Sequence, residues 1–160
     1  MRKKHQTLPT NWKKRELLRE KGQFWTPNWV AEAMVSYALG RDGRTIFDPA
    51  VGGGAFLLAA KHFAQRTQRK IELCGCELYA ESLREALASG LDGKDLSAVE
   101  IRDFVLNPPE QQWQAVVANP PYIRHHRLGE KLKQDLRLLA KTLIGKTLDG
   151  RAGYHVYFLL

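Results

Sequence analysis

The segment Asn119-Pro120-Pro121-Tyr122 brings together hydrogen-bond acceptors, a stiff backbone and an aromatic ring, directly after the apolar run 115–118. A short apolar run that stops at two prolines predicts a buried strand ending in a rigid loop. Proline fixes φ, so the Pro120 carbonyl is held next to the side-chain oxygen of Asn119. Two fixed acceptors suit a planar substrate with an NH2 group, on which the Tyr122 ring would stack. This segment alone leaves open a proline-stiffened loop with a surface tyrosine.

A second candidate site begins with the apolar strand predicted at residues 45–48, which leads into Gly52-Gly53-Gly54 and then a helical pattern. A strand, a glycine-rich turn and a helix form the nucleotide-binding corner of a doubly wound α/β sheet. No Gly-Lys-Ser/Thr follows, so this is not a phosphate-binding P-loop, and Leu57 stands where a dinucleotide fingerprint needs its third glycine. Asp48 would repel a pyrophosphate but attract ammonium and sulfonium groups. The segment therefore favours S-adenosylmethionine as its ligand.

Two further acidic residues follow predicted strands. Residues 71–77 predict a strand ending at Glu77, at the distance from the glycine turn where a carboxylate accepts from ribose hydroxyls. Residues 98–104 predict another strand, which ends in Asp103-Phe104. Asp103 could accept from an adenine amino group, and Phe104 could pack on the ring. Each acid alone is more simply a solvated strand end, but ligands of open α/β sheets bind where the strands end.

The elements that must position these residues alternate between strands and helices, which predicts a parallel α/β sheet. A basic helix is expected at residues 11–21. Thr26 is the expected N-cap of a helix that has Pro27 at its first position and runs to about Leu39. An amphipathic helix is expected at 128–143, a loop at 145–153, and the start of another apolar helix at 154–160.

Taken in order, these motifs resemble the N-terminal part of adenine-N6 DNA methyltransferases in which the cofactor motif precedes the catalytic motif. The matching segments are Phe24-Trp25-Thr26-Pro27, Asp48 to Phe56, Glu77, Asp103-Phe104 and Asn119 to Tyr122, over roughly residues 22–123. Gly53 departs from the family pattern, which often has serine or threonine there. The resemblance implies a Rossmann-like S-adenosylmethionine-dependent methyltransferase fold and a role in bacterial or archaeal restriction-modification systems, in the cytoplasm.

The resemblance also implies roles for individual residues. The expected catalytic residues are Asn119, Pro120, Pro121 and Tyr122. The expected cofactor-binding residues are Thr26, Asp48, Pro49, Ala50, Gly52, Gly54, Phe56, Glu77, Asp103 and Phe104.

Composition agrees with a nucleic-acid partner. The formal net charge of +8 favours a polyanion, and basic residues gather at 2–4, at 13–15 and, directly after Tyr122, at 124–141. No run is apolar enough to span a bilayer or to form the core of a secretory signal. With only two cysteines, Cys74 and Cys76, a metal site is not expected, and His125-His126 reads as a solvated pair.

Only four strands can be recognised, whereas the family's sheet has seven. We therefore expect residues 22–160 to be the first part of a catalytic domain, preceded by a basic helical extension at 1–21. The fourth strand would form an unprotected edge, so the chain alone is expected to associate and to lack activity. The expected substrate partner is double-stranded DNA, from which the target base is flipped. A missing C-terminal half, a specificity domain or a restriction subunit is expected as a protein partner, and no membrane partner is expected.

The expected reaction is methyl transfer from S-adenosylmethionine to adenine N6. Protein glutamine-N5 and RNA guanine-N2 methyltransferases are alternatives with the same acceptor chemistry. A non-catalytic module that binds nucleic acid or a partner through its basic surface is an alternative of another class. The Phe-Trp-Thr-Pro segment and the Asp-Pro-Ala turn favour DNA.

Overall fold

The structure is a computed structural model that describes residues 25–160. These residues form two compact units. The first unit comprises residues 25–104 and 109–119, and the second comprises 105–108 and 120–160. The predicted basic helix at 11–21, and with it the predicted extension at 1–21, lie outside the described residues.

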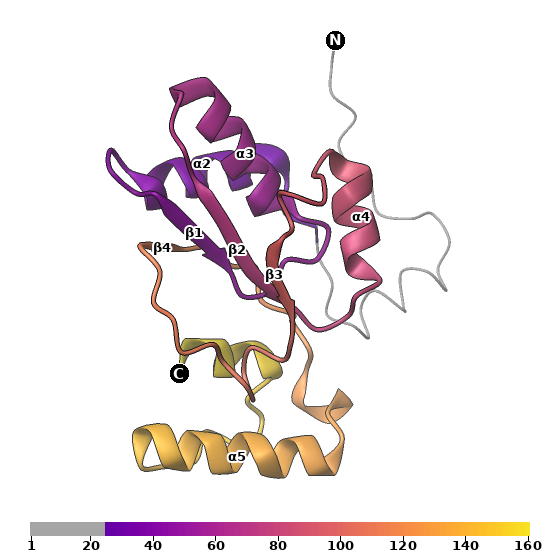
Figure 1. The fold of residues 1–160 in the computed structure, drawn as a ribbon. Coiled ribbons are helices and arrows are strands. Elements are labelled where there is room, and N and C mark those ends of the chain that lie inside the picture. The colour runs from indigo at the N-terminus through magenta and orange to yellow at the C-terminus, as the bar shows by residue number, and fades with distance from the viewer. Residues whose placement is uncertain (1–24) are drawn as a thin grey trace. The chain divides into compact units, whose positions relative to one another are not determined.

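The first unit is built on a four-stranded parallel sheet, shown in Figure 1. Its strands are β1 (Thr45–Asp48), β2 (Glu72–Glu77), β3 (Ala98–Ile101) and β4 (Ala115–Val116), in the order β3-β2-β1-β4. All three pairs are parallel, which confirms the predicted α/β sheet. β4 is shorter than predicted, although the Val117 amide still donates to the Phe47 carbonyl beyond its end.

Each face of the sheet has its own apolar cluster, because successive side chains of a strand point to opposite faces. On one face, Ile46 packs with the helices α2 (Asn28–Leu39) and α3 (Ala55–Thr67). The neighbouring residue Phe47 packs on the other face with Cys74 and Cys76. The third helix of this unit, α4 (Ser82–Ser89), packs against α3 through Ala86 and Leu57.

Helix α2 starts one residue later than predicted. Pro27 occupies the N-cap position, and its carbonyl accepts from the amides of Val30 and Ala31. The predicted N-cap at Thr26 is therefore wrong, and no side chain caps this helix. The predicted end at Leu39 is confirmed.

The second unit contains the 3₁₀ turn η1 (His125–Arg127), the helix α5 (Glu130–Ile144) and the 3₁₀ helix η2 (Tyr154–Leu159). α5 confirms the predicted amphipathic helix, with Leu136 and Ala140 buried. The expected apolar helix after residue 154 is wrong in type, since the structure has a 3₁₀ helix there. The Tyr154 amide donates to the Ile123 carbonyl, which ties η2 to the start of this unit.

Among the described residues, none of the helices combines the length and the apolar character that crossing a bilayer would require.

Two glycines are required by close packing next to β1. Gly54 has φ +78°, and a Cβ there would lie 2.6 Å from Leu91 Cδ1. At Gly75, in the middle of β2, a Cβ would lie 2.5 Å from Val51 Cγ2 and 2.7 Å from the backbone oxygen of Asp48. A backbone oxygen cannot rotate away, so the turn after β1 can approach β2 only because residue 75 has no side chain.

We therefore expect Gly75→Ala to lower the free energy of unfolding by about 1–3 kcal/mol, as overpacking does. Gly93→Ala is the matched control, because a Cβ at Gly93 meets no atom within 4 Å and should change stability by less than about 0.5 kcal/mol. Urea denaturation of the two variants measures the difference. Equal stability of both would contradict the packing described here.

Candidate active site

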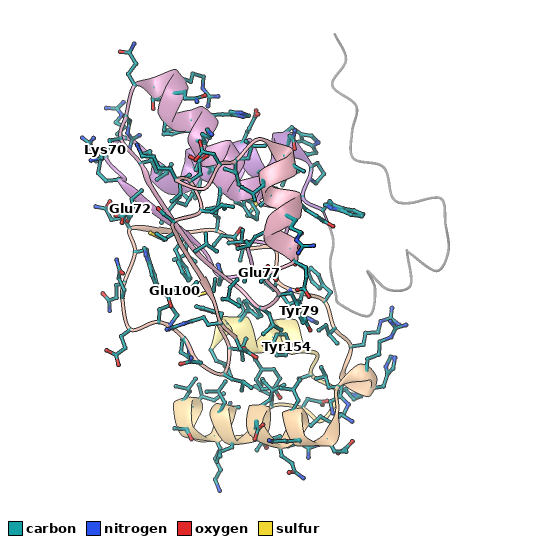
Figure 2. The ribbon with its side chains drawn as sticks, turned by 45° about the vertical axis from the view of Figure 1, so that its right-hand side comes forward. Lys70, Glu72, Glu77, Tyr79, Glu100 and Tyr154 are labelled. Carbon is teal, nitrogen blue, oxygen red and sulfur yellow. The ribbon has the colours of Figure 1, made fainter. Side chains whose placement is uncertain are left out.

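The predicted site residues of the first unit gather where its parallel strands end. β1 ends at Asp48 and β2 at Glu77, while Asp103 and Asn119 follow β3 and β4 within three residues. Figure 2 shows Glu77 and Tyr79 at one end of β2, with Lys70 and Glu72 at the other. Between β1 and β4 the order of strands reverses, and ligands of open α/β sheets bind outside such a switch point.

Asp48 forms a tight turn with the two residues after it. Its Oδ1 accepts from the Ala50 amide at 3.0 Å, which closes an Asx turn around Pro49. The residue is only 1% exposed, and Oδ2 is buried with no hydrogen-bond partner among the described residues. Such a group is costly to leave unsatisfied. A buried acceptor oxygen is therefore available at the end of β1.

Burial raises the pKa of the Asp48 carboxyl from 3.8 to about 7. The hydrogen bond from the Ala50 amide lowers this pKa and so opposes part of the rise, whereas the neighbouring charge of Glu77 raises it further. A cation placed near Oδ2 would favour the ionised carboxylate and lower its pKa again. The site is thus electrostatically suited to a positively charged ligand.

Glu77 connects the end of β2 to the glycine-rich turn. Its Oε2 accepts from the Gly52 amide at 2.7 Å, and its Oε1 accepts from the Tyr79 amide at 2.9 Å. Each carboxylate oxygen can accept a second hydrogen bond, so these contacts orient Glu77 and leave it able to bind hydroxyl groups.

The glycine-rich turn is held between two other segments. The Val51 amide donates to the Cys76 carbonyl, and Gly54 is the N-cap of α3. At Gly53 the nearest atoms to a Cβ would be 3.8 Å away or more, so this position has room for the side chain that the family pattern often carries.

Asp103 and Phe104 lie in the loop after β3, and both are half-buried. The Arg102 amide donates to the Glu77 carbonyl, which fixes the start of this loop beside β2. The Phe104 ring lies 5.8 Å from the Phe47 ring, and Trp113 stacks on Phe47 at 3.7 Å. One side of Phe104 is therefore packed against the sheet.

Asn119 lies just beyond β4, and its Nδ2 donates to Thr26 Oγ1 at 3.1 Å. The remainder of the predicted catalytic segment belongs to the second unit. There Tyr122 is 48% exposed and its ring centroid lies 5.0 Å from that of His155, and the Ile123 amide donates to the Pro121 carbonyl.

Most predicted cofactor residues of the first unit lie at the strand ends or in the glycine-rich turn. Phe56 differs from them, since it is 3% exposed and packs in the core with Ala31, Val35 and Leu39 of α2. In this structure Phe56 supports the start of α3 from inside. Its predicted contact with a cofactor stays a prediction, as do the individual roles of the other site residues.

Some residues that shape the site were not found from the sequence. Two of these act through the backbone: the Tyr79 amide orients Glu77, and Gly75 leaves room for the turn after β1. The other two are Trp113, which stacks on Phe47, and His155, which contacts Tyr122. Gly75 had a usable signal, because glycine inside a predicted strand often marks a close backbone approach. Tyr79 and His155 had none.

Among the described residues, no group of three or more histidine, cysteine, aspartate or glutamate side chains could hold a metal ion.

Comparison with known proteins places the chain in a family. Residues 13–151 match the family model of the N-6 DNA Methylase. The chain belongs to the N-6 DNA methylase family. It is 31% identical over 146 residues to the type II methyltransferase M.XamI of Xanthomonas campestris pv. amaranthicola, covering 87% of this chain and 26% of that protein. It is 27% identical to the type II methyltransferase M.AccI of Acinetobacter calcoaceticus, in a match that covers 86% of this chain and 24% of that protein. The chain thus spans about a quarter of the length of these curated relatives.

Solved structures agree on the fold. A type I restriction-modification methyltransferase subunit from Streptococcus thermophilus has a TM-score of 0.58 at 22% identity, over 91% of this chain and 34% of that one. A putative class I S-adenosylmethionine-dependent methyltransferase from Listeria monocytogenes has a TM-score of 0.58 at 16% identity, over 82% of this chain and 39% of that one. The predicted methyltransferase fold is confirmed, and the four parallel strands are part of that fold.

The buried acid gives a prediction about stability and pH. Because the folded-state pKa of Asp48 is raised, folding opposes its ionisation, and stability falls as pH rises from about 4 to about 7. Asp48→Asn keeps an acceptor for the Ala50 amide but does not titrate. In the ligand-free protein, we expect the stability of the wild type relative to Asp48→Asn to fall by up to about 4 kcal/mol over this range.

Urea denaturation of both proteins at several pH values measures this difference and cancels the titration of groups that they share. A stability difference independent of pH would show that Asp48 ionises normally in the folded state.

Proposed function

We propose that this chain carries the cofactor-binding and catalytic part of a DNA adenine-N6 methyltransferase. The observation that carries the proposal is the placement of Asp48, Glu77 and Asn119 at the ends of adjacent parallel strands around the switch point. Family membership supports the same reaction class. The cofactor is S-adenosylmethionine, and the methyl acceptor is the exocyclic amine of adenine.

The residues at the strand ends fit this cofactor. The partnerless Oδ2 of Asp48 would accept from its ammonium group, in a buried site where the attraction between opposite charges is strong. The oriented carboxylate of Glu77 would accept from the ribose hydroxyls. Two adjacent carboxylates would repel a phosphate, so this arrangement disfavours a nucleotide phosphate as the ligand. Asp103 and Phe104 would contact the adenine, with Pro49, Ala50, Gly52 and Gly54 forming the wall of the site.

S-adenosylmethionine supplies an electrophilic methyl group on its sulfonium. The chain's contribution is to orient the acceptor amine, which is a poor nucleophile because its lone pair is delocalised into the ring. The Asn119 side-chain oxygen and the Pro120 carbonyl would accept hydrogen bonds from its two N–H groups and thereby localise the lone pair toward the methyl group. Positioning of this kind contributes at most about 7–11 kcal/mol to lowering the barrier.

The target adenine must leave the double helix to reach these acceptors, which costs a few kcal/mol. Stacking on the exposed ring of Tyr122 would offset part of this cost. His155, which contacts that ring, would help to hold it in place.

The distribution of charge supports DNA as the partner. Residues 120–160 contain eight lysine and arginine residues and three acidic residues. Residues 25–119 contain nine lysine and arginine residues and twelve acidic residues. The basic charge thus follows the proposed catalytic segment, and the cofactor-binding part is acidic. Phosphates of the DNA backbone would bind to the basic part. A specificity domain, a C-terminal half or a restriction subunit as further partners, and a cytoplasmic location, stay predictions.

Isotope-labelled S-adenosylmethionine tests the proposal. The active protein is incubated with the labelled cofactor and double-stranded DNA, and the DNA is then digested to nucleosides. We expect the label in N6-methyladenine. Parallel incubations with protein and with RNA in place of DNA test the alternatives. Label in glutamine or in RNA guanine would favour those acceptors, and no transfer to any of the three substrates would favour a binding module.

Asn119→Ala should abolish turnover and leave the affinity for S-adenosylmethionine nearly unchanged, because Asn119 contacts the target amine in this proposal. Loss of one transition-state acceptor should raise the barrier by about 3 kcal/mol or more. Turnover rates and calorimetric cofactor affinities separate the two effects. Normal turnover of the Asn119→Ala variant would show that Asn119 takes no part in the reaction.

Glu77→Ala should weaken cofactor binding far more than DNA binding, because charge-assisted hydrogen bonds to the ribose contribute about 1.5–3 kcal/mol each. The variant also loses the contacts to the Gly52 and Tyr79 amides. Glu77→Gln removes the charge but keeps the size of the side chain and an acceptor for one of these amides, so it serves as the milder matched variant. Wild-type cofactor affinity in Glu77→Ala would contradict the assignment.

A further inference from the structure

A side-chain hydrogen bond joins two segments of the first unit that are far apart in the sequence and meet near the switch point. Asn119 Nδ2 donates to Thr26 Oγ1 at 3.1 Å, across 93 residues of sequence. Thr26 directly precedes the N-cap of α2, and Asn119 follows β4 by three residues. Both residues belong to the first unit, and both are half-buried.

Both ends of this hydrogen bond are held by packing. α2 packs on the segment before Asn119, since Ala31 and Val35 share a buried cluster with Ala115 and Val117. The Val117 amide also donates to the Phe47 carbonyl of β1. The core therefore fixes α2 and the end of β4, from which Thr26 and Asn119 extend by a few residues.

The Thr26 hydroxyl is available for this contact because it does not cap the helix. Pro27 takes the N-cap position, and α2 has no side-chain cap. At the N-cap of a helix, a threonine hydroxyl accepts a hydrogen bond from a backbone amide of the first helical turn. Here the hydroxyl accepts instead from a distant side chain.

The contact holds the plane of the Asn119 amide next to Thr26. A hydroxyl can donate or accept, and in the structure it accepts from Nδ2. One end of a side-chain amide donates and the other accepts, and a rotation of 180° exchanges them. Donation from Nδ2 to Thr26 directs Oδ1 to the other side. The rotated amide would present an NH2 group to the amine of the target, where two donors oppose each other.

We propose that Thr26 is a positioning residue for methyl transfer, whose hydroxyl holds the Asn119 amide in the orientation in which Oδ1 accepts from the target amine. This inference rests on the proposed function of Asn119. This role replaces the cofactor contact that the family resemblance implies for Thr26, so that the hydroxyl acts on the reaction and not on the affinity for the cofactor. An acceptor that is oriented in advance does not have to reorganise during the reaction.

The activity test compares Thr26→Val, which replaces the hydroxyl by a methyl group of similar size, with Thr26→Ser, which keeps the hydroxyl. In the active protein, Thr26→Val should lower kcat roughly tenfold, the effect of losing one hydrogen bond that matters in the transition state. The dissociation constant of S-adenosylmethionine should stay the same, and Thr26→Ser should have nearly wild-type kcat. Thr26→Ala, also without the hydroxyl, replaces Thr26→Val if that variant does not fold.

A second readout needs no turnover. In the NMR spectrum of the active protein, one Nδ2 proton of Asn119 should be shifted downfield and exchange slowly in the wild type and in Thr26→Ser, but not in Thr26→Val. Wild-type kcat in Thr26→Val, or a loss confined to cofactor affinity, would overturn the inference. An active Asn119→Ala variant would overturn the proposed function itself, whereas an inactive Asn119→Ala variant beside a fully active Thr26→Val overturns only the role of Thr26.

Discussion

The site depends on the burial of one carboxyl group at the end of the central strand pair. Asp48 ends β1, which pairs with β2 on one side and β4 on the other, and it is almost completely excluded from solvent. Only one of its oxygens has a hydrogen-bond partner among the described residues. In the absence of a ligand this carboxyl resists ionisation, which is why its pKa is raised to about 7.

Several neighbouring features are needed to keep Asp48 in this position. The turn after β1 lies against β2 because Gly75 has no side chain, and the Val51 amide holds it to the Cys76 carbonyl. Glu77 then binds the Gly52 amide from the end of β2. The two acids are thereby brought close enough for the charge of Glu77 to raise the pKa of Asp48. A cationic ligand would relieve both the burial cost and the repulsion, so binding and the charge state of Asp48 are linked.

The sequence predicted those parts of the molecule whose signals are local. Four apolar runs gave the four strands, and the acids that follow them predicted the edge at which the site lies. The hydrogen bond between Thr26 and Asn119 joins residues 93 positions apart, so no local pattern could reveal it, and its partner Thr26 was assigned to a helix cap instead. Phe56 was expected beside the cofactor because it closes the glycine motif, but the start of α3 turns it into the core. Residues 154–159 have the apolar composition of a helix, yet the Tyr154 amide is engaged by the Ile123 carbonyl and the segment forms a 3₁₀ helix.

The central claim is that a positively charged cofactor binds beside the buried carboxyl of Asp48. Calorimetric titration with S-adenosylmethionine in buffers of different ionisation enthalpy counts the protons exchanged on binding. At about pH 6.5, roughly three quarters of Asp48 is protonated if its pKa is about 7, so binding should release up to roughly that fraction of a proton. Asp48→Asn should release none. Binding to the wild type without proton release would contradict the account, because the cofactor would then not be in contact with Asp48.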